Sequence, residues 1–183
     1  LTLIIFREVA TLLTTSDEWS IPILIASGLI SVEVKIIWFF ISLEVLSNCA
    51  IEPEIKDLVN FLKSMGCNIN WISKRSIKIE GVSNVKEINY SVMFDRIEAG
   101  TYLIAAAVTE GNLKIQNVVP KIIQTEINTL KKLGVKIKVK KDEVHIVGNK
   151  KIKSIKIKTA PYPGFPTDLQ AQMMVLLCKA NKQ

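Results

Sequence analysis

Apolar residues recur at helical spacing in two segments of the chain, and in each segment the pattern ends at a glycine and turns into a strand. The first segment covers residues 54–69 and the second covers residues 122–137. A glycine at the end of such a pattern is typical of a helix stop, because glycine tolerates a positive φ. Since the segments lie about 68 residues apart, we predict a duplicated α/β subdomain rather than a solenoid repeat.

Each copy continues, after a short polar turn, into a second strand, predicted at residues 76–80 and 143–147. In the second copy an alanine-rich helix over residues 102–109 ends at a Glu-Gly pair, and residues 112–117 follow as a strand. The expected unit is therefore helix, strand, helix, strand, strand, with one further strand before it. This order predicts an α/β fold in the broad sense (α+β).

Two acidic residues stand where helices are expected to begin. Asp95, with Glu98 three residues later, has the spacing of a capping box before the alanine-rich helix. Glu52 precedes Pro53, a natural first helical residue, which places the glutamate at the cap of the next helix. Because glutamate is a poor cap by itself, a second role for Glu52 is favoured. A purely structural explanation also stands: Asp95 caps its helix while Arg96 and Glu98 pair in solvent.

The loop at residues 161–166 holds three prolines and one glycine, so it is unsuited to a helix or a strand. Thr167, with Gln170 three residues later, predicts a capping box for an apolar helix over residues 168–180. Asp168 then lies in the first helical turn, where backbone N–H groups and the helix dipole favour a negative charge. Either the loop presents this carboxylate to a substrate as an acceptor or base, or it is a proline turn before a capped helix.

Composition narrows the class of protein. Of the 183 residues, 49% are hydrophobic, which supports a buried core, and three scattered cysteines indicate neither a disulfide framework nor a zinc site. We expect Cys67 and Cys178 to be core residues and Cys49 to precede a helix. His145 falls in a predicted strand and is interpreted as a strand surface residue. This cysteine usage is typical of a reducing compartment, and we expect the protein in the cytoplasm.

The net charge of +7 has a local origin, because residues 131–158 hold eleven lysines against two acidic residues. In residues 135–140 and 155–158, isoleucines and valines alternate with lysines, which predicts strands with one apolar and one basic face. Such a face could bind phosphate groups or nucleic acid. The solvent-facing side of a sheet is the favoured interpretation, since no aromatic residue or arginine interleaves the lysines. We therefore expect no nucleic-acid partner.

The N-terminal segment is hydrophobic but matches neither a membrane span nor a signal peptide. Its longest uncharged run, residues 19–32, is shorter than the roughly 20 apolar residues that a spanning helix needs. The basic start and small-residue cleavage site of a signal peptide are missing. We expect no membrane association; the alternative is a membrane-associated remnant anchored by residues 19–43.

Three motifs together resemble the enolpyruvyl transferases. They are Asp-Arg-Ile-Glu-Ala-Gly-Thr at residues 95–101, Pro-Gly-Phe-Pro-Thr-Asp-Leu-Gln at residues 163–170, and Asn-Cys-Ala-Ile-Glu-Pro-Glu-Ile at residues 48–55. The resemblance runs from about Glu44 to the C-terminus. It is specific for the branch that acts on UDP-N-acetylglucosamine, because the sister enzyme of the shikimate pathway shares the architecture but not the proline loop.

The resemblance implies a fold of six βαβαββ units in two lobes, an inside-out α/β barrel with the active site between the lobes. Residues 44–94 would then end the first lobe, and residues 95–183 would begin a truncated second lobe, so the fold is expected to be incomplete. Residues 1–43 stay unassigned, because the alanine-rich helix and turn glycine expected at residues 28–43 are missing. A frameshift or gene decay upstream of Glu44 would produce such a junction; alternatively, this segment fills the same place as a genuine apolar helix or strand.

The resemblance also implies a reaction: transfer of enolpyruvyl from phosphoenolpyruvate to the 3-hydroxyl of UDP-N-acetylglucosamine, without metal or organic cofactor. This is the first committed step of peptidoglycan synthesis. By motif, Asp168 contacts the sugar hydroxyl as the catalytic base, and Thr167, Asp95 and Glu52 bind substrate. The family's cysteine loop, uridine-binding loop and phosphoenolpyruvate-binding arginines lack counterparts here, so an inactive fragment is expected. The alternative is a non-catalytic basic α/β module that binds through the lysine-rich 131–158 face.

Overall fold

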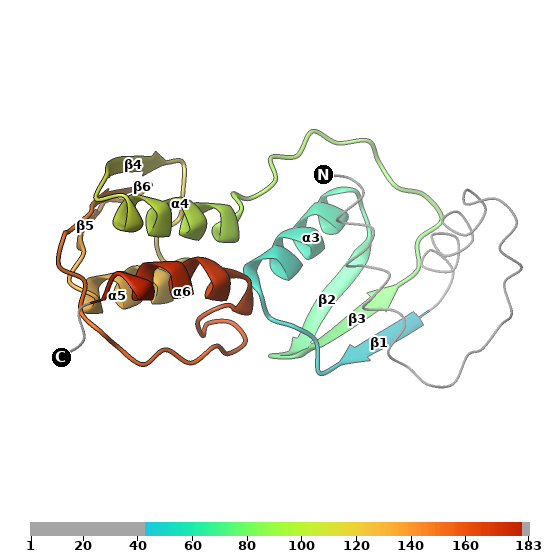
Figure 1. The fold of residues 1–183 in the computed structure, drawn as a ribbon. Helices are drawn as coiled ribbons and strands as arrows, with labels where there is room; N and C mark the ends of the chain where they lie inside the picture. The colour runs from blue at the N-terminus through green and yellow to red at the C-terminus, as the bar shows by residue number, and fades with distance from the viewer. Residues whose placement is uncertain (1–42, 181–183) are drawn as a thin grey trace, which may run out of the picture.

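The computed structural model describes residues 43–180, which form two units joined by an irregular segment (Figure 1). The first unit contains β1 (Leu43–Ser47), α3 (Pro53–Ser64), β2 (Asn68–Ser73) and β3 (Ser76–Glu80). The second contains α4 (Arg96–Val108), β4 (Asn112–Gln116), α5 (Gln124–Lys132), β5 (Lys136–Val139), β6 (Glu143–Val147), the 3-10 turn η1 (Thr167–Leu169) and α6 (Gln170–Cys178).

The two sheets have the same topology. β3 lies between β1 and β2, β6 lies between β4 and β5, and all four pairs are antiparallel. The outer strands of each sheet therefore run in the same direction, and a helix, α3 or α5, connects them, as a crossover between parallel strands requires. The predicted duplication and the α+β class are confirmed. The sheets of the described residues do not close into a barrel, as expected of an incomplete set of βαβαββ units.

The duplication extends to the backbone conformation of single residues. Gly66 follows α3 with φ at 100°, and Gly134 follows α5 with φ at 93°. Asn48 follows β1 with φ at 57°, and Asn117 follows β4 with φ at 59°. Glycine and asparagine are the residues that adopt positive φ most readily, so each unit reverses its chain with the same residue type at the same place.

Each unit has its own hydrophobic core. In the second unit, α4 and α6 pack together, and α5 and the sheet complete the core. Its fully buried side chains include Leu103, Ile127, Ile146, Leu169 and Leu176. The first unit buries a smaller set from α3, β2 and β3 and the approach to α3: Cys49, Val59, Cys67, Ile69, Ile77 and Ile79. The larger core therefore supports the unit that carries two of the three motifs.

The strand expected at residues 155–158 does not form. This segment is extended, with half-buried isoleucines and exposed lysines in alternation, but it joins neither sheet. Only isolated bridges flank it, from Ile152 to Ala180 and from Thr159 to Phe165. The alternating pattern correctly indicated an extended backbone with one apolar face, but a strand also needs a neighbour to receive its hydrogen bonds, and the described residues supply none there.

Two further expectations were wrong. The strand expected before α4 is absent, because residues 81–95 contain neither helix nor strand. Asp57 of α3 binds this segment instead, accepting hydrogen bonds from the Tyr90 hydroxyl at 2.9 Å and from the Met93 N–H at 3.2 Å.

Cys178, expected in the core, is exposed. It lies two residues after buried Leu176, which turns it to the opposite face of the helix. The helix missing from residues 28–43 falls almost entirely outside the described residues.

Candidate active site

Asp95 is the N-cap of α4, as predicted. Its Oδ1 accepts hydrogen bonds from the N–H groups of Ile97 at 2.7 Å and Glu98 at 3.0 Å. These bonds satisfy two of the backbone donors that the first turn of a helix leaves free. The Asp95 side chain is nevertheless exposed. It can therefore hold the start of α4 and still present its carboxylate to a ligand.

Glu52 occupies the N-cap position of α3 with Pro53 as the first helical residue, as the sequence predicts. Its side chain makes no capping hydrogen bond. The Oε2 atom is buried and has no hydrogen-bond partner among the described residues. A buried carboxylate oxygen without a donor is uncommon in folded proteins. Glu52 is thus available as an acceptor at the beginning of α3.

The proline loop is a closed turn fixed to its surroundings. The Gly164 N–H donates to the Pro161 carbonyl at 2.7 Å, and the Ala160 N–H donates to the Phe165 carbonyl at 2.9 Å. Thr125, in α5, donates its hydroxyl to the Pro163 carbonyl at 2.6 Å. The loop is therefore held both internally and by the start of α5, as the proline-rich sequence predicts.

The loop leads into η1, which carries Thr167 and Asp168 with exposed side chains. The capping box expected between Thr167 and Gln170 is wrong, because Pro166 is the N-cap of η1, Leu169 is the N-cap of α6, and neither cap uses a side-chain hydrogen bond. A 3-10 turn takes the place of the first α-helical turn, so the Thr167 side chain is not positioned as a cap. Asp168 lies in this 3-10 turn, two residues before α6 begins, and not in the first turn of the α-helix as expected.

Leu169 anchors this turn to α4. Its side chain is fully buried, and its Cδ1 lies 2.5 Å from the position that a Cβ of Gly100 would occupy. Gln172 of α6 adds a hydrogen bond from its Nε2 to the Thr101 hydroxyl at 3.1 Å. Gly100 and Thr101, in the motif at residues 95–101, are therefore the groups against which Leu169 and Gln172 pack.

Arg96, which the sequence reasoning did not select, lies at the centre of this region. It is only 7% exposed, and its Nε donates to Glu54 Oε1 of α3 at 2.9 Å. Its Nη1 is 4.0 Å from Glu126 Oε1 of α5, and its Cζ is 5.6 Å from the ring centroid of Tyr162 in the proline loop. Arg96 therefore does not form the solvent pair with Glu98 that the purely structural alternative required, and it contacts three other segments.

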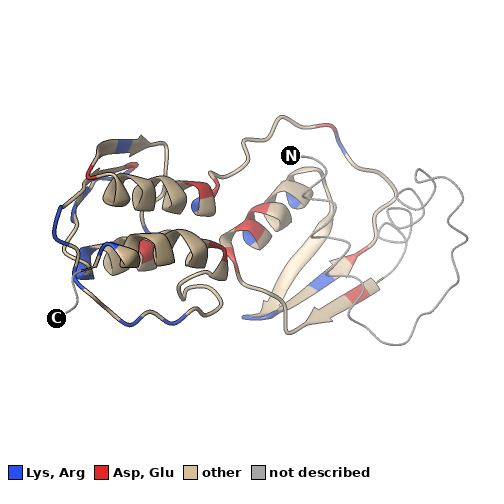
Figure 2. Ribbon diagram, in the orientation of Figure 1, with Lys and Arg blue, Asp and Glu red and all other residues tan. Residues whose placement is uncertain are grey.

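Arg96, in the motif at residues 95–101, thus contacts the motif at residues 48–55 through Glu54 and the start of the proline loop through Tyr162. The first residues of α3, α4 and α5 meet there, and acidic residues mark the facing beginnings of α3 and α4 (Figure 2). Within residues 43–180, no three acidic, histidine or cysteine side chains converge closely enough to hold a metal ion. Two of the residues that meet at Arg96, and Arg96 itself, are sequence neighbours of the candidate carboxylates Glu52, Asp95 and Asp168.

Burial raises the pKa of the Glu126 carboxyl above its ordinary value of 4.5. Its own backbone N–H and the charge of Arg96 oppose that effect, and the charge of Glu54 adds to it. The side chain of Glu126 is only 3% exposed, whereas that of Glu54 is 48% exposed. Desolvation penalises the ionised form, which explains why a nearby guanidinium at 4.0 Å does not reverse the shift.

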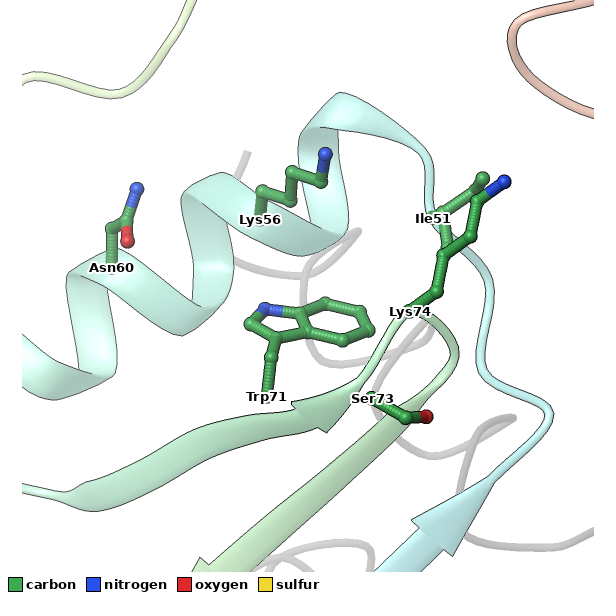
Figure 3. A pocket seen from close by; sticks show the side chains of 6 residues that line it. All are labelled: Ile51, Lys56, Asn60, Trp71, Ser73 and Lys74. Carbon is green, nitrogen blue, oxygen red and sulfur yellow. The ribbon is translucent and has the colours of Figure 1, made fainter.

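A shallow groove of about 400 Å³ lies elsewhere, between α3 and the end of β2. Trp71 and Ser73 of β2 line it, with Lys56 and Asn60 of α3, Lys74 after the strand and Ile51 before α3 (Figure 3). The groove is separate from the contacts of Arg96 and contains none of the residues expected to bind substrate. It is therefore not part of the candidate site.

The lysine-rich residues lie mostly on the side of the second unit away from α3 (Figure 2). Two lysines are paired with one acidic residue: the Nζ atoms of Lys140 and Lys114 are 3.1 Å and 3.7 Å from the Glu143 carboxylate. Mainly because of Lys140, the pKa of Glu143 is lowered from its ordinary value of 4.5.

His145 lies in β6, half-buried, with Nε2 2.6 Å from Asn112 Oδ1, which agrees with a strand position. None of the helices described in residues 43–180 is long and apolar enough to cross a lipid bilayer.

Comparison with known proteins gives consistent matches. Residues 31–182 match the model of a family described as EPSP synthase (3-phosphoshikimate 1-carboxyvinyltransferase). A UDP-N-acetylglucosamine 1-carboxyvinyltransferase from Pelagibacter ubique is 76% identical over 138 residues, which are 75% of this chain and 33% of that protein. One from Halothermothrix orenii is 47% identical over 137 residues, again 75% of this chain and 33% of the relative. The chain therefore spans about a third of the length of these relatives.

A solved structure also shares the fold. The enolpyruvyl transferase NikO from Streptomyces tendae superimposes with a TM-score of 0.67 at 21% sequence identity. The match covers 82% of this chain and 37% of NikO. At that identity the likeness concerns the fold alone, and it agrees with the repeated units described above.

Proposed function

The chain belongs to the EPSP synthase family, and from this premise we propose that it is part of an enolpyruvyl transferase that acts on UDP-N-acetylglucosamine. The reaction moves the enolpyruvyl group of phosphoenolpyruvate to the 3-hydroxyl of the sugar and releases phosphate. It is the first committed step of peptidoglycan synthesis, and we place the protein in the cytoplasm, where its nucleotide-sugar substrate is made. The observation that carries the proposal is the 76% identity with a protein named for this activity.

The geometry of the candidate site supports specific roles. Asp168 is exposed at the end of a fixed loop, and in the proposed mechanism its carboxylate accepts the proton of the 3-hydroxyl as that oxygen attacks. Thr167, Asp95 and Glu52 bind the sugar nucleotide around it. Glu52 offers a buried acceptor that no described residue uses, which suits a hydroxyl or amide donor of the ligand.

The proposed reaction also needs groups that the described residues do not offer. An acid must protonate the methylene carbon of phosphoenolpyruvate, and cations must hold its phosphate and carboxylate. Arg96, which follows Asp95 in the chain, is already engaged by Glu54 and Glu126. We therefore propose that this chain alone does not turn over its substrates. A phosphate-release assay on the purified chain, with both substrates present, should show no turnover, and clear turnover would contradict the proposal.

A chimera gives a direct test of the function. Residues 44–180 of this chain replace the matching third of the Pelagibacter ubique protein, and phosphate release is measured with and without each substrate. We expect release that depends on both phosphoenolpyruvate and UDP-N-acetylglucosamine. The proposal fails if the chimera folds, as judged by circular dichroism and a cooperative melt, but releases no phosphate.

Asp168 is tested in the same chimera. Asp168→Asn keeps the shape of the side chain but cannot accept the proton, so we expect the rate to fall about 100-fold or more. Asp142→Asn is the matched control, because it makes the same chemical change at an exposed turn beside the lysine-rich face. Equal rates for the two variants would remove Asp168 from the mechanism.

The second candidate is a non-catalytic basic module that binds through the lysine-rich 131–158 face. The exposed lysines of residues 150–158 favour it, whereas the pairing of Lys114 and Lys140 with Glu143 reduces the charge of the neighbouring strands. A DNA-binding titration at 50 mM and 200 mM salt discriminates the two candidates. Affinity that falls steeply with salt, together with an inactive chimera, would favour the basic module.

A further inference from the structure

Arg96 contacts three segments from a single buried position. Its guanidinium hydrogen bonds to Glu54, which is two residues after Glu52, and stands over the ring of Tyr162, which is six residues before Asp168. Asp95 is its immediate neighbour in the chain. Each of the three candidate carboxylates is therefore close in sequence to a group that Arg96 touches or to Arg96 itself.

A buried arginine is a costly way to join these segments. Removing an ion from water costs several kcal/mol, and apolar residues of similar size often give equal or greater stability at such positions. One of its two carboxylate partners, on Glu54, is half-exposed, and the other, on Glu126, is 4.0 Å away. Arg96 is thus poorly explained as a stabilising residue. Its planar fork, in contrast, can contact a carboxylate at its edge and an aromatic ring at its face at the same time, which a lysine cannot do.

We propose that Arg96 is a positioning residue that fixes the proline loop carrying Asp168 relative to Asp95 and to the Glu52–Glu54 segment. This inference rests on the proposed function, because it assigns the purpose of the contact to the substrate site. Arg96 itself touches no reacting atom in this scheme. It acts through Tyr162 and Glu54, so its loss changes the order of the loop more than the stability of the core.

Hydrogen–deuterium exchange on the full chain tests the positioning directly. In Arg96→Met, which keeps the buried stem and removes the charge, amides of residues 161–169 should exchange at least about tenfold faster, whereas amides of β6 keep their rates. Tyr162→Leu removes only the ring and should accelerate the same loop by about 2- to 30-fold, the range expected for the loss of a cation–π contact. Tyr102→Leu, at an exposed tyrosine of α4, is the matched control and should leave the loop unchanged.

Two results would overturn the inference. One is unchanged exchange of residues 161–169 in both Arg96→Met and Tyr162→Leu. The other is acceleration of all second-unit amides by the same factor, which is the result expected of a merely structural residue. Because Tyr162→Leu leaves the ion pairs of Arg96 in place, it keeps the test decisive even if Arg96→Met does not fold.

The chimera separates failure of this inference from failure of the proposed function. If the chimera with Arg96 intact is active, the Arg96→Met chimera should lose at least about tenfold in kcat, and Arg96→Lys should recover little of it. An Arg96→Met chimera with full activity would contradict the positioning role while leaving the enolpyruvyl transferase proposal intact. An inactive chimera with Arg96 intact would contradict the function, and the exchange result would still decide whether Arg96 orders the loop.

Discussion

Substituting Gly100 by alanine tests whether the motif at residues 95–101 packs against the motif at residues 163–170, as the structure indicates. Gly100 lies in α4, where alanine is the better helix former by about 0.5–1 kcal/mol. Helix propensity alone therefore predicts that Gly100→Ala stabilises the chain. The added Cβ, however, would lie 2.5 Å from Leu169 Cδ1 and 3.4 Å from its Cδ2. Leu169 is fully buried and has little room to move.

The sizes of these two opposing effects decide whether Gly100→Ala stabilises or destabilises the chain. Overpacking of a buried contact costs about 1–3 kcal/mol, and the gain in helix propensity offsets about 0.5–1 kcal/mol of it. Gly100→Ala should therefore lower the free energy of unfolding by up to about 2.5 kcal/mol. Leu169→Ala removes a buried side chain and should lower it by about 2–5 kcal/mol. In the double variant the clash disappears and the new methyl fills part of the cavity. The double variant should thus be more stable than the sum of the single effects predicts, by about 1–3 kcal/mol.

Urea unfolding of the purified chain, followed by far-UV circular dichroism, measures this coupling. The three tryptophans are at positions 19, 38 and 71, so tryptophan fluorescence reports on the chain before α4 and provides an internal control. Leu133→Ala, at the end of α5, is the matched control because it removes an equally buried leucine away from Gly100. Its effect should add to that of Gly100→Ala within about 0.5 kcal/mol. The reasoning is refuted if Gly100→Ala and Leu169→Ala are also additive within that margin.

Other substitutions test the site and its surroundings. Because burial raises the pKa of Glu126, the folded chain binds more protons than the unfolded chain between pH 4.5 and that raised value. The free energy of unfolding should therefore fall as pH rises through this window. Urea titrations at several pH values should show a flatter fall for Glu126→Gln. Because the pKa of Glu143 is lowered, the stability that it contributes is present above pH 4.5 and should be lost as pH falls through the lowered value. Glu143→Gln should remove that loss. An unchanged decrease in the free energy of unfolding at low pH would contradict this prediction. A Cβ at Gly164 would lie 2.8 Å from the backbone carbonyls of Ala160 and Pro161, so Gly164→Ala should open the loop to protease while the melting temperature changes by only a few degrees; equal cleavage rates would count against the turn. With a thiol reagent under native conditions, Cys178 should react at once and the two buried cysteines only on unfolding, which mass spectrometry of the labelled peptides can check.

Local chemistry explains what the sequence could predict. The stop glycines at 66 and 134, the cap at Asp95 and the position of Glu52 before Pro53 depend on residues within a few positions of one another. Such signals are set by backbone conformation and by the free N–H groups of a helix start, so they survive in any tertiary context. The duplicated unit follows from the stop glycines and the strands after them, because these signals occur in the same order in both halves.

The features that the sequence could not predict depend on distant neighbours. Residues 155–158 have a strand pattern, but a sheet partner is a property of another part of a fold. Thr167 has a capping spacing, but the packing of Leu169 against Gly100 accompanies a 3-10 turn in place of the expected helical start. Arg96 lies two residues before Glu98, a spacing that allows a solvent-exposed ion pair. Its burial follows only from the arrangement of α3, α5 and the proline loop around it.

The three candidate carboxylates differ in how much a structural role accounts for them. Asp95 is fully explained as a cap, because its oxygen holds two backbone donors of α4. Asp168 lies in the 3-10 turn before α6, where the helix dipole favours a negative charge whether or not a substrate is present. Glu52 has neither explanation. It stands at a cap position without capping, and no described residue donates a hydrogen bond to its buried oxygen. A buried oxygen that the fold leaves without a donor can receive a hydrogen bond from a ligand, and for this reason we propose Glu52 as a substrate-binding residue.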